Sequence, residues 1–109
     1  GATPPSDADG CLQDVHWSAG LFGYFPTYTL GNLAAAQLFD TASKEIESLN
    51  QDIAAGDFRK LLGWLRSNIH QHGRCYSGDE LVRNATGKTL SSDPLMSYLE
   101  NKLRPLYRI

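Results

Sequence analysis

The chain has 109 residues, of which 41% are hydrophobic and 20% are charged, and its formal net charge is −2. This length suits one domain with a modest core, and the slight acidic excess argues against a nucleic-acid partner, because nucleic-acid-binding domains carry a basic surface. No apolar run approaches the roughly 20 residues that span a membrane, and two cysteines are too few to predict a disulfide framework.

The first ten residues predict an irregular segment. Pro4 and Pro5 disfavour regular helix there, and residues 6–10 are typical of turns. No basic stretch followed by an apolar one occurs at the start, so we expect no signal peptide and a cytoplasmic location. Residues 11–17 have no clean period and predict either one helical turn or an extended segment.

Apolar residues at steps of three and four predict a long first helix. It begins at Pro26, which suits a first helical turn, and ends before Gly56, a residue type that often follows a helix. Its expected buried face consists of Leu30, Leu33, Ala34, Leu38, Ala42, Ile46, Leu49 and Ile53.

A second helix is predicted after Asp57, which would cap it. Its apolar stripe consists of Phe58, Leu61, Leu62, Leu65 and Ile69. We expect this helix to end around His70, His72 and Gly73.

Two more helices follow, each with its own start signal. Ser77 and Glu80 have the spacing of a capping box and open a short helix, Asp79–Ala85, that closes near Gly87. Asp93 and Pro94 open the last helix, which has Leu95, Leu99, Leu103 and Leu106 on one stripe and which Pro105 ends. No alternating run predicts a strand, so the expected fold class is all-α, with four to five helices in a single fragment covering residues 1–109.

The histidines and cysteines predict no metal site. No HExxH or CxxC spacing occurs, and His70 and His72 are two positions apart, which places them on different sides of a helix. We expect this pair to have a structural role at a helix C-terminus. Cys11 is expected to be inert although His16 follows five residues later, and the pairing of Cys11 and Cys75 stays open.

Polar and aromatic residues are dense at 10–17 and 22–33, which have the sequences GCLQDVHW and FGYFPTYTLGNL. From its residues alone, this segment could be a capped and well-packed helix entry. The first stretch, however, resembles the GxxQDxHW signature of the thermostable (Taq-type) carboxypeptidases, zinc metallopeptidases that remove C-terminal residues. The second stretch resembles the segment that follows the signature in that family, and weaker similarity continues along the later helices.

The resemblance implies that this chain is a C-terminal piece of a larger helical enzyme. In the family, the HExxH helix and the third metal ligand, a glutamate, precede this segment. Zinc or another divalent metal would therefore be the cofactor of the intact enzyme, and the piece alone would bind none and be inactive. The implied partners are peptide substrates and the missing N-terminal catalytic part.

The resemblance also implies roles for particular residues. Related helical zinc peptidases, of the angiotensin-converting-enzyme and neurolysin types, carry a histidine followed by a tyrosine that stabilises the oxyanion. By this similarity Tyr24 is expected to donate to the oxyanion, and His16 is expected to bind the substrate or the intermediate. The expected substrate contacts or supporting residues are Gln13, Asp14, Trp17 and Tyr28.

Each supporting residue also has a structural alternative. Asp14 lies two positions before His16, where a carboxylate can set the imidazole tautomer, but it could equally cap a helix. Tyr28 is one helical turn from Tyr24 and could simply pack in the core. If Trp17 and its aromatic neighbours form an exposed patch, we expect association into a homodimer. The alternative function is a stand-alone, non-catalytic helical interaction module.

Overall fold

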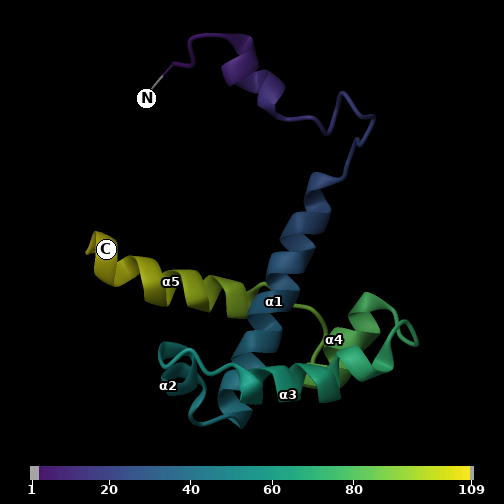
Figure 1. The fold of residues 1–109 in the computed structure, drawn as a ribbon, viewed down its shortest axis with the longest axis vertical. Helices are drawn as coiled ribbons and strands as arrows, with labels where there is room; N and C mark the ends of the chain where they lie inside the picture. The colour runs from purple at the N-terminus through teal and green to yellow at the C-terminus, as the bar shows by residue number, and fades with distance from the viewer. Residues whose placement is uncertain (1–2, 109) are drawn as a thin grey trace. The chain divides into compact units, whose positions relative to one another are not determined.

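The computed structural model describes residues 3–108, and all regular structure in this range is helical. Five α-helices follow one another along the chain: α1 (Phe25–Glu45), α2 (Leu49–Ala54), α3 (Arg59–Asn68), α4 (Gly78–Thr86) and α5 (Asp93–Tyr107). Three short 3₁₀ helices accompany them: η1 (Asp7–Asp9), η2 (Cys11–Gln13) and η3 (His70–His72). The predicted all-α fold class is confirmed, and Figure 1 shows the order of the elements.

The chain divides into two compact units, Gly1–Leu30 and Gly31–Ile109, and each is described by itself. The prediction of a single fragment over residues 1–109 stays a prediction. None of the helices between residues 3 and 108 is long and apolar enough to cross a membrane.

The first unit consists of short turns that lead into α1. Ser6 caps η1 by accepting a hydrogen bond from the backbone N–H of Asp9, so the predicted irregular lead-in contains one turn of 3₁₀ helix. Residues 11–13 form η2, the helical alternative of the two predicted there. No residue from 3 to 30 is buried, so this unit is held by local hydrogen bonds and ring contacts.

The core of the second unit lies where α1, α2, α3 and α4 meet. Ala42 and Leu49 are 0% and 2% exposed, and Trp64 and Ala85 join them in one buried cluster. Half-buried side chains surround the cluster: Leu38, Ile46, Ile53, Leu61, Leu65 and Ile69. The predicted face of the first helix is therefore correct from Leu38 to Ile53, whereas Leu30 is exposed. Of the later predicted stripes, Leu61, Leu65 and Ile69 pack against the cluster. Four of their members are exposed: Phe58, Leu62, Leu103 and Leu106.

The prediction of one continuous helix from Pro26 to residue 55 is wrong, because the chain turns between Glu45 and Leu49. The backbone N–H of Leu49 bonds to the carbonyl of Ile46, three residues back, instead of continuing the α-helical pattern. Side chains of α3 hold this turn. The indole of Trp64 donates to the Glu45 carboxylate at 2.5 Å, and Lys60 donates to the Ser48 hydroxyl at 2.6 Å.

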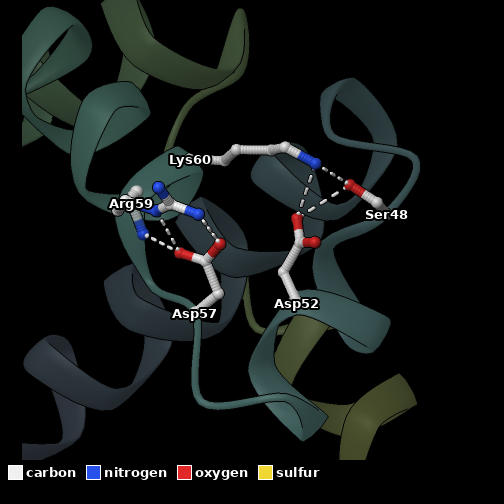
Figure 2. A network of polar contacts seen from close by, with 5 residues as sticks. All are labelled: Ser48, Asp52, Asp57, Arg59 and Lys60. Carbon is white, nitrogen blue, oxygen red and sulfur yellow. Dashed lines mark hydrogen bonds and ion pairs between the residues drawn. The ribbon is translucent and has the colours of Figure 1, made fainter.

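Two carboxylates organise the segment between α1 and α3 (Figure 2). Asp52 accepts from the Ser48 hydroxyl at 2.8 Å and pairs with Lys60 at 3.0 Å. These two contacts lower the pKa of the Asp52 carboxyl, the Ser48 hydrogen bond most. Asp57 accepts from the backbone N–H of Arg59 and from its guanidinium, and these bonds hold the pKa of Asp57 well below its usual range. Asp57 thus satisfies an N–H in the first turn of α3, as expected, although the residue at the helix boundary is Phe58.

Helix α4 has the predicted end signals. The Ser77 hydroxyl accepts from the backbone N–H of Glu80, and the Glu80 carboxylate accepts from the backbone N–H of Ser77 at 2.8 Å, so the capping box is confirmed. These hydrogen bonds lower the pKa of the Glu80 carboxyl. Gly87 ends the helix with φ 72°, a left-handed conformation that glycine adopts without steric cost.

Helix α5 runs past the residue predicted to end it. Ser92, rather than Asp93, stands at the N-terminal boundary, and Pro94 lies in the first turn as expected. Pro105 lies inside the helix, which continues to Tyr107. Pro105 has no N–H to donate, but the backbone N–H of Arg108 still bonds to the carbonyl of Arg104, so the last turn forms around it.

One polar residue, Gln37, is buried at 3% exposure, which no pattern in the sequence predicts. Its side-chain nitrogen donates to the Thr86 hydroxyl at 3.0 Å and to the Thr89 carbonyl at 3.1 Å. Its side-chain oxygen accepts from the backbone N–H of Ser91 at 2.9 Å. One amide therefore fixes the connection between α4 and α5 against α1.

We expect Ser77→Ala to destabilise the chain by about 1 kcal/mol, because the variant loses the side-chain acceptor of an N-terminal cap. Ser92→Ala is the matched control, since Ser92 stands at the same position of α5 but makes no capping hydrogen bond. Urea denaturation of both variants measures the difference. A Ser92→Ala variant as unstable as Ser77→Ala would contradict this account of the cap.

Acid should destabilise the folded chain in part through Asp52. Because its pKa is lower in the folded than in the unfolded chain, its contribution is present above about pH 4 and is lost as the pH falls further. We expect the urea midpoint of Asp52→Asn to change less with pH between about 5 and 2 than that of the parent chain. Glu47→Gln serves as control, because Glu47 makes no ion pair within residues 3–108.

Candidate functional site

Asp14 and His16 form the polar centre of the first unit. Asp14 follows η2 in an extended conformation, with φ −86° and ψ 117°. One of its carboxylate oxygens accepts from the backbone N–H of His16 at 2.8 Å and lies 2.7 Å from the ring Nδ1 of the same residue. Such an i to i+2 contact is a local turn that aspartate forms readily. Both hydrogen bonds favour the ionised form and lower the pKa of the Asp14 carboxyl, the backbone bond most.

The second ring nitrogen of His16 also has a partner. Its Nε2 lies 3.1 Å from the hydroxyl oxygen of Tyr28, which stands in the first turn of α1. Asp14, His16 and Tyr28 thus form one chain of hydrogen bonds, called the polar chain below. His16 is the least exposed of the three residues in this polar chain. Tyr28 remains half exposed, at 51%.

Aromatic rings surround the imidazole of His16. The ring centroid of Phe25 lies 4.6 Å away and that of Tyr24 lies 5.7 Å away, nearly parallel to the imidazole. Tyr24 and Tyr28 contact each other edge to face at 5.3 Å, in agreement with the one-turn spacing seen in the sequence. These contacts fix the imidazole plane, while the hydrogen bonds fix its rotation.

The hydroxyl of Tyr24 differs from that of Tyr28. It makes no hydrogen bond to any residue between 3 and 108, and the side chain is 43% exposed. Gly23, directly before it, has φ 75°, a backbone conformation that other residues rarely adopt. This turn brings Tyr24 beside the imidazole at the start of α1 and leaves its hydroxyl open to a ligand.

The two remaining predicted residues lie outside the polar chain. The Gln13 amide donates to the carbonyl of Ala8 and so closes the turn between η1 and η2. Trp17 stacks against Phe22, with ring centroids 6.1 Å apart. Trp17 also lines a largely apolar cavity of about 440 Å³, whose other walls are Cys11, Leu12, Asp14, Ser18 and Phe25.

The described residues do not form a metal site. Within residues 3–108, no three His, Cys, Asp or Glu side chains gather so that they could hold a metal ion. His70 and His72 lie in η3, where the His72 ring contacts Tyr76. Cys11 and Cys75 are both exposed and free, so the structure contains no disulfide between them. What the described part of the first unit does position is a set of hydrogen-bond donors and acceptors.

The family described as Carboxypeptidase Taq (M32) metallopeptidase matches residues 1–103. The chain belongs to this family. It is 48% identical over 107 residues to thermostable carboxypeptidase 1 of Thermus thermophilus and 40% identical over 107 residues to carboxypeptidase 1 of Bacillus subtilis. Each alignment covers 98% of this chain and 21% of the relative, so the chain spans about a fifth of the length of these relatives.

Solved structures agree with the sequence relatives. A carboxypeptidase of this family from Deinococcus radiodurans superposes with a TM-score of 0.85 at 43% identity, covering 99% of this chain and 22% of that chain. Metallocarboxypeptidase 1 of Trypanosoma cruzi superposes with a TM-score of 0.82 at 46% identity, covering 91% and 21%. The resemblance seen in the signature residues is confirmed along nearly the whole chain.

The sequence identified each member of the polar chain separately but did not predict their connection. The sequence spacing predicts Asp14 near His16 and Tyr28 beside Tyr24. The contact between His16 and Tyr28 joins residues twelve positions apart, across two turns whose geometry no local motif specifies. The one available signal was the Asp-x-His spacing, which predicts the Asp14 contact but not the partner of Nε2.

Proposed function

We propose that the complete polypeptide containing this sequence is a metal-dependent carboxypeptidase that hydrolyses the C-terminal peptide bond of peptides. Family membership and the names of the relatives support this function. Within this chain, the observation that carries the proposal is the hydroxyl of Tyr24, which makes no hydrogen bond within residues 3–108 and lies beside a fully hydrogen-bonded His16. The segment would supply contacts to the substrate and to the oxyanion, and residues elsewhere in the polypeptide would supply the metal site.

The metal of the complete enzyme is proposed to be zinc, bound by residues outside this sequence. The described part of the chain offers no set of three ligands, so it does not fit a metal centre by itself. The proposed partners are peptide substrates and an N-terminal catalytic part, in a cytoplasmic enzyme. The side chains of Trp17, Tyr24 and Phe25 are exposed and would suit contact with that part or with a second copy of the protein.

Tyr24 is the proposed donor to the oxyanion. A tyrosine hydroxyl is protonated at neutral pH and can donate to a negative oxygen. No acceptor among the described residues takes the hydrogen of the Tyr24 hydroxyl, so it is available to the oxyanion. His16, oriented by its polar chain, is proposed to contact the substrate or the intermediate. Gln13 is proposed to stabilise the turn before Asp14 through its hydrogen bond to Ala8. Trp17 is proposed to form a wall of the adjoining cavity, where an apolar substrate side chain would fit.

Tyr24→Phe in the complete polypeptide should lower kcat roughly 100- to 1000-fold, the effect of losing one oxyanion donor. KM should stay within a few-fold, because the lost hydrogen bond forms only in the transition state. Steady-state kinetics on an N-blocked dipeptide measures both constants. Tyr76→Phe is the matched control, because Tyr76 has the same exposed fraction of 43% but lies in the second unit. A Tyr24→Phe variant that kept more than about a third of the parent turnover would make Tyr24 a wall residue.

Metal analysis gives an independent test. The 109-residue chain alone should hold no stoichiometric zinc and cleave no peptide, because the histidines and carboxylates between residues 3 and 108 do not converge. The complete polypeptide should hold tightly bound metal and lose activity when a chelator removes it. One zinc ion bound tightly per 109-residue chain would contradict the proposed location of the metal site.

A further inference from the structure

The two tyrosines beside His16 differ in one respect that the proposed function does not use. The hydroxyl of Tyr24 has no partner among the residues that the structure describes, whereas the hydroxyl of Tyr28 shares a hydrogen bond with His16 Nε2 at 3.1 Å. Tyr28 nevertheless remains half exposed, so its oxygen can contact a ligand at the same time. The direction of its hydrogen therefore decides whether that ligand meets a donor or an acceptor.

Asp14 determines which ring nitrogen of His16 carries the hydrogen. An ionised carboxylate only accepts hydrogen bonds, and the Asp14 oxygen lies 2.7 Å from Nδ1. Nδ1 must therefore be protonated, whatever the charge of the ring. In the neutral ring Nε2 is then an acceptor. Its donor among residues 3–108 is the Tyr28 hydroxyl, which must direct its hydrogen at the ring.

Protonation of His16 reverses the bond to Tyr28. In the imidazolium both ring nitrogens donate, so Nε2–H donates to the Tyr28 oxygen and the Tyr28 hydrogen must point elsewhere. Only then can Tyr28 donate to a ligand. The groups that face His16 in this unit are Asp14, Tyr24, Phe25 and Tyr28, and Asp14 is the only charged one, so no neighbouring cation opposes the imidazolium.

We propose that Tyr28 donates a hydrogen bond to the terminal carboxylate of the peptide substrate when His16 is protonated, and that Asp14 and His16 are the positioning residues that release this hydrogen. The proposal rests on the proposed carboxypeptidase function, which supplies the carboxylate. A carboxylate only accepts, so Tyr28 can serve as its partner beside the imidazolium but not beside the neutral ring. Substrate binding should then weaken with rising pH, as His16 loses its second ring hydrogen.

The first experiment measures the tautomer and does not depend on activity. In the complete polypeptide, with histidine rings labelled with ¹⁵N, the His16→Gln variant identifies the His16 signal. At a pH where the ring is neutral, we expect the hydrogen on Nδ1, and we expect Asp14→Asn to give a mixture, because an amide can accept from or donate to Nδ1. A His16 ring protonated on Nε2 in the parent protein would overturn the proposal.

The second experiment compares KM with kcat as a function of pH, using an N-blocked dipeptide. We expect KM of the parent enzyme to rise with pH. Tyr28→Phe should abolish that rise. It should also raise KM roughly tenfold at the acidic end, which is the effect of one lost hydrogen bond to a charged group. Tyr76→Phe should keep the parent profile. If Tyr28→Phe keeps the parent pH dependence of KM, the proposal is wrong.

Two further outcomes distinguish a wrong assignment of the carboxylate to Tyr28 from a wrong proposed function. The amide of the same blocked dipeptide, tested as a competitive inhibitor, lacks the carboxylate and should bind equally well to the parent and to Tyr28→Phe. If it binds more weakly to Tyr28→Phe, Tyr28 contacts a carbonyl instead and the assignment to the carboxylate falls. A complete polypeptide that hydrolyses no peptide, yet shows the Nδ1 tautomer, would contradict the proposed function while the structural part of this inference stands.

Discussion

The carboxylate of Asp14 binds the backbone N–H and the ring Nδ1 of His16 with one and the same oxygen atom. The rest of the first unit depends on this contact more than on packing, because no residue from 3 to 30 is buried. In a unit without a core, local hydrogen bonds must fix the side chains. Asp14 binds the backbone N–H and the imidazole of His16 at once, so the backbone conformation of residues 14–16 sets the position of the ring.

The second unit achieves its order in a different way. Its buried cluster is small, so few apolar side chains hold the helices together. Polar contacts therefore connect the helices as well: those of Gln37, and the hydrogen bond from Trp64 to Glu45. A buried amide with three satisfied contacts fixes a geometry more precisely than an apolar side chain of the same size, because each lost contact would leave an unpaired polar atom. The many exposed aromatic and aliphatic side chains of this chain fit the proposal that a longer polypeptide covers part of them.

Features set by neighbouring residues could be predicted from the sequence, and features set by distant ones could not. The capping box of Ser77 and Glu80 and the terminal Gly87 are local, and both are confirmed. The turn after Glu45 was missed because Ile46 and Leu49 keep the apolar period on both sides of it, while the contacts that hold the turn come from α3. The partners of Gln37 could not be predicted either, because they lie about fifty residues further along the chain.

The candidate site shows this boundary within a few residues. The Asp14 contact follows from a spacing of two, and the family signature adds the expectation that His16 and Tyr24 take part in chemistry. Neither of these identifies the atom that faces Nε2. Once Tyr28 occupies that position, the two tyrosines are no longer interchangeable. The hydroxyl of Tyr24 can donate to a ligand whatever the charge of the ring, whereas that of Tyr28 donates outward only when the ring beside it carries a second hydrogen. A family signature thus indicates where the chemistry lies, and the hydrogen-bond partners of each atom decide which side chain can perform it.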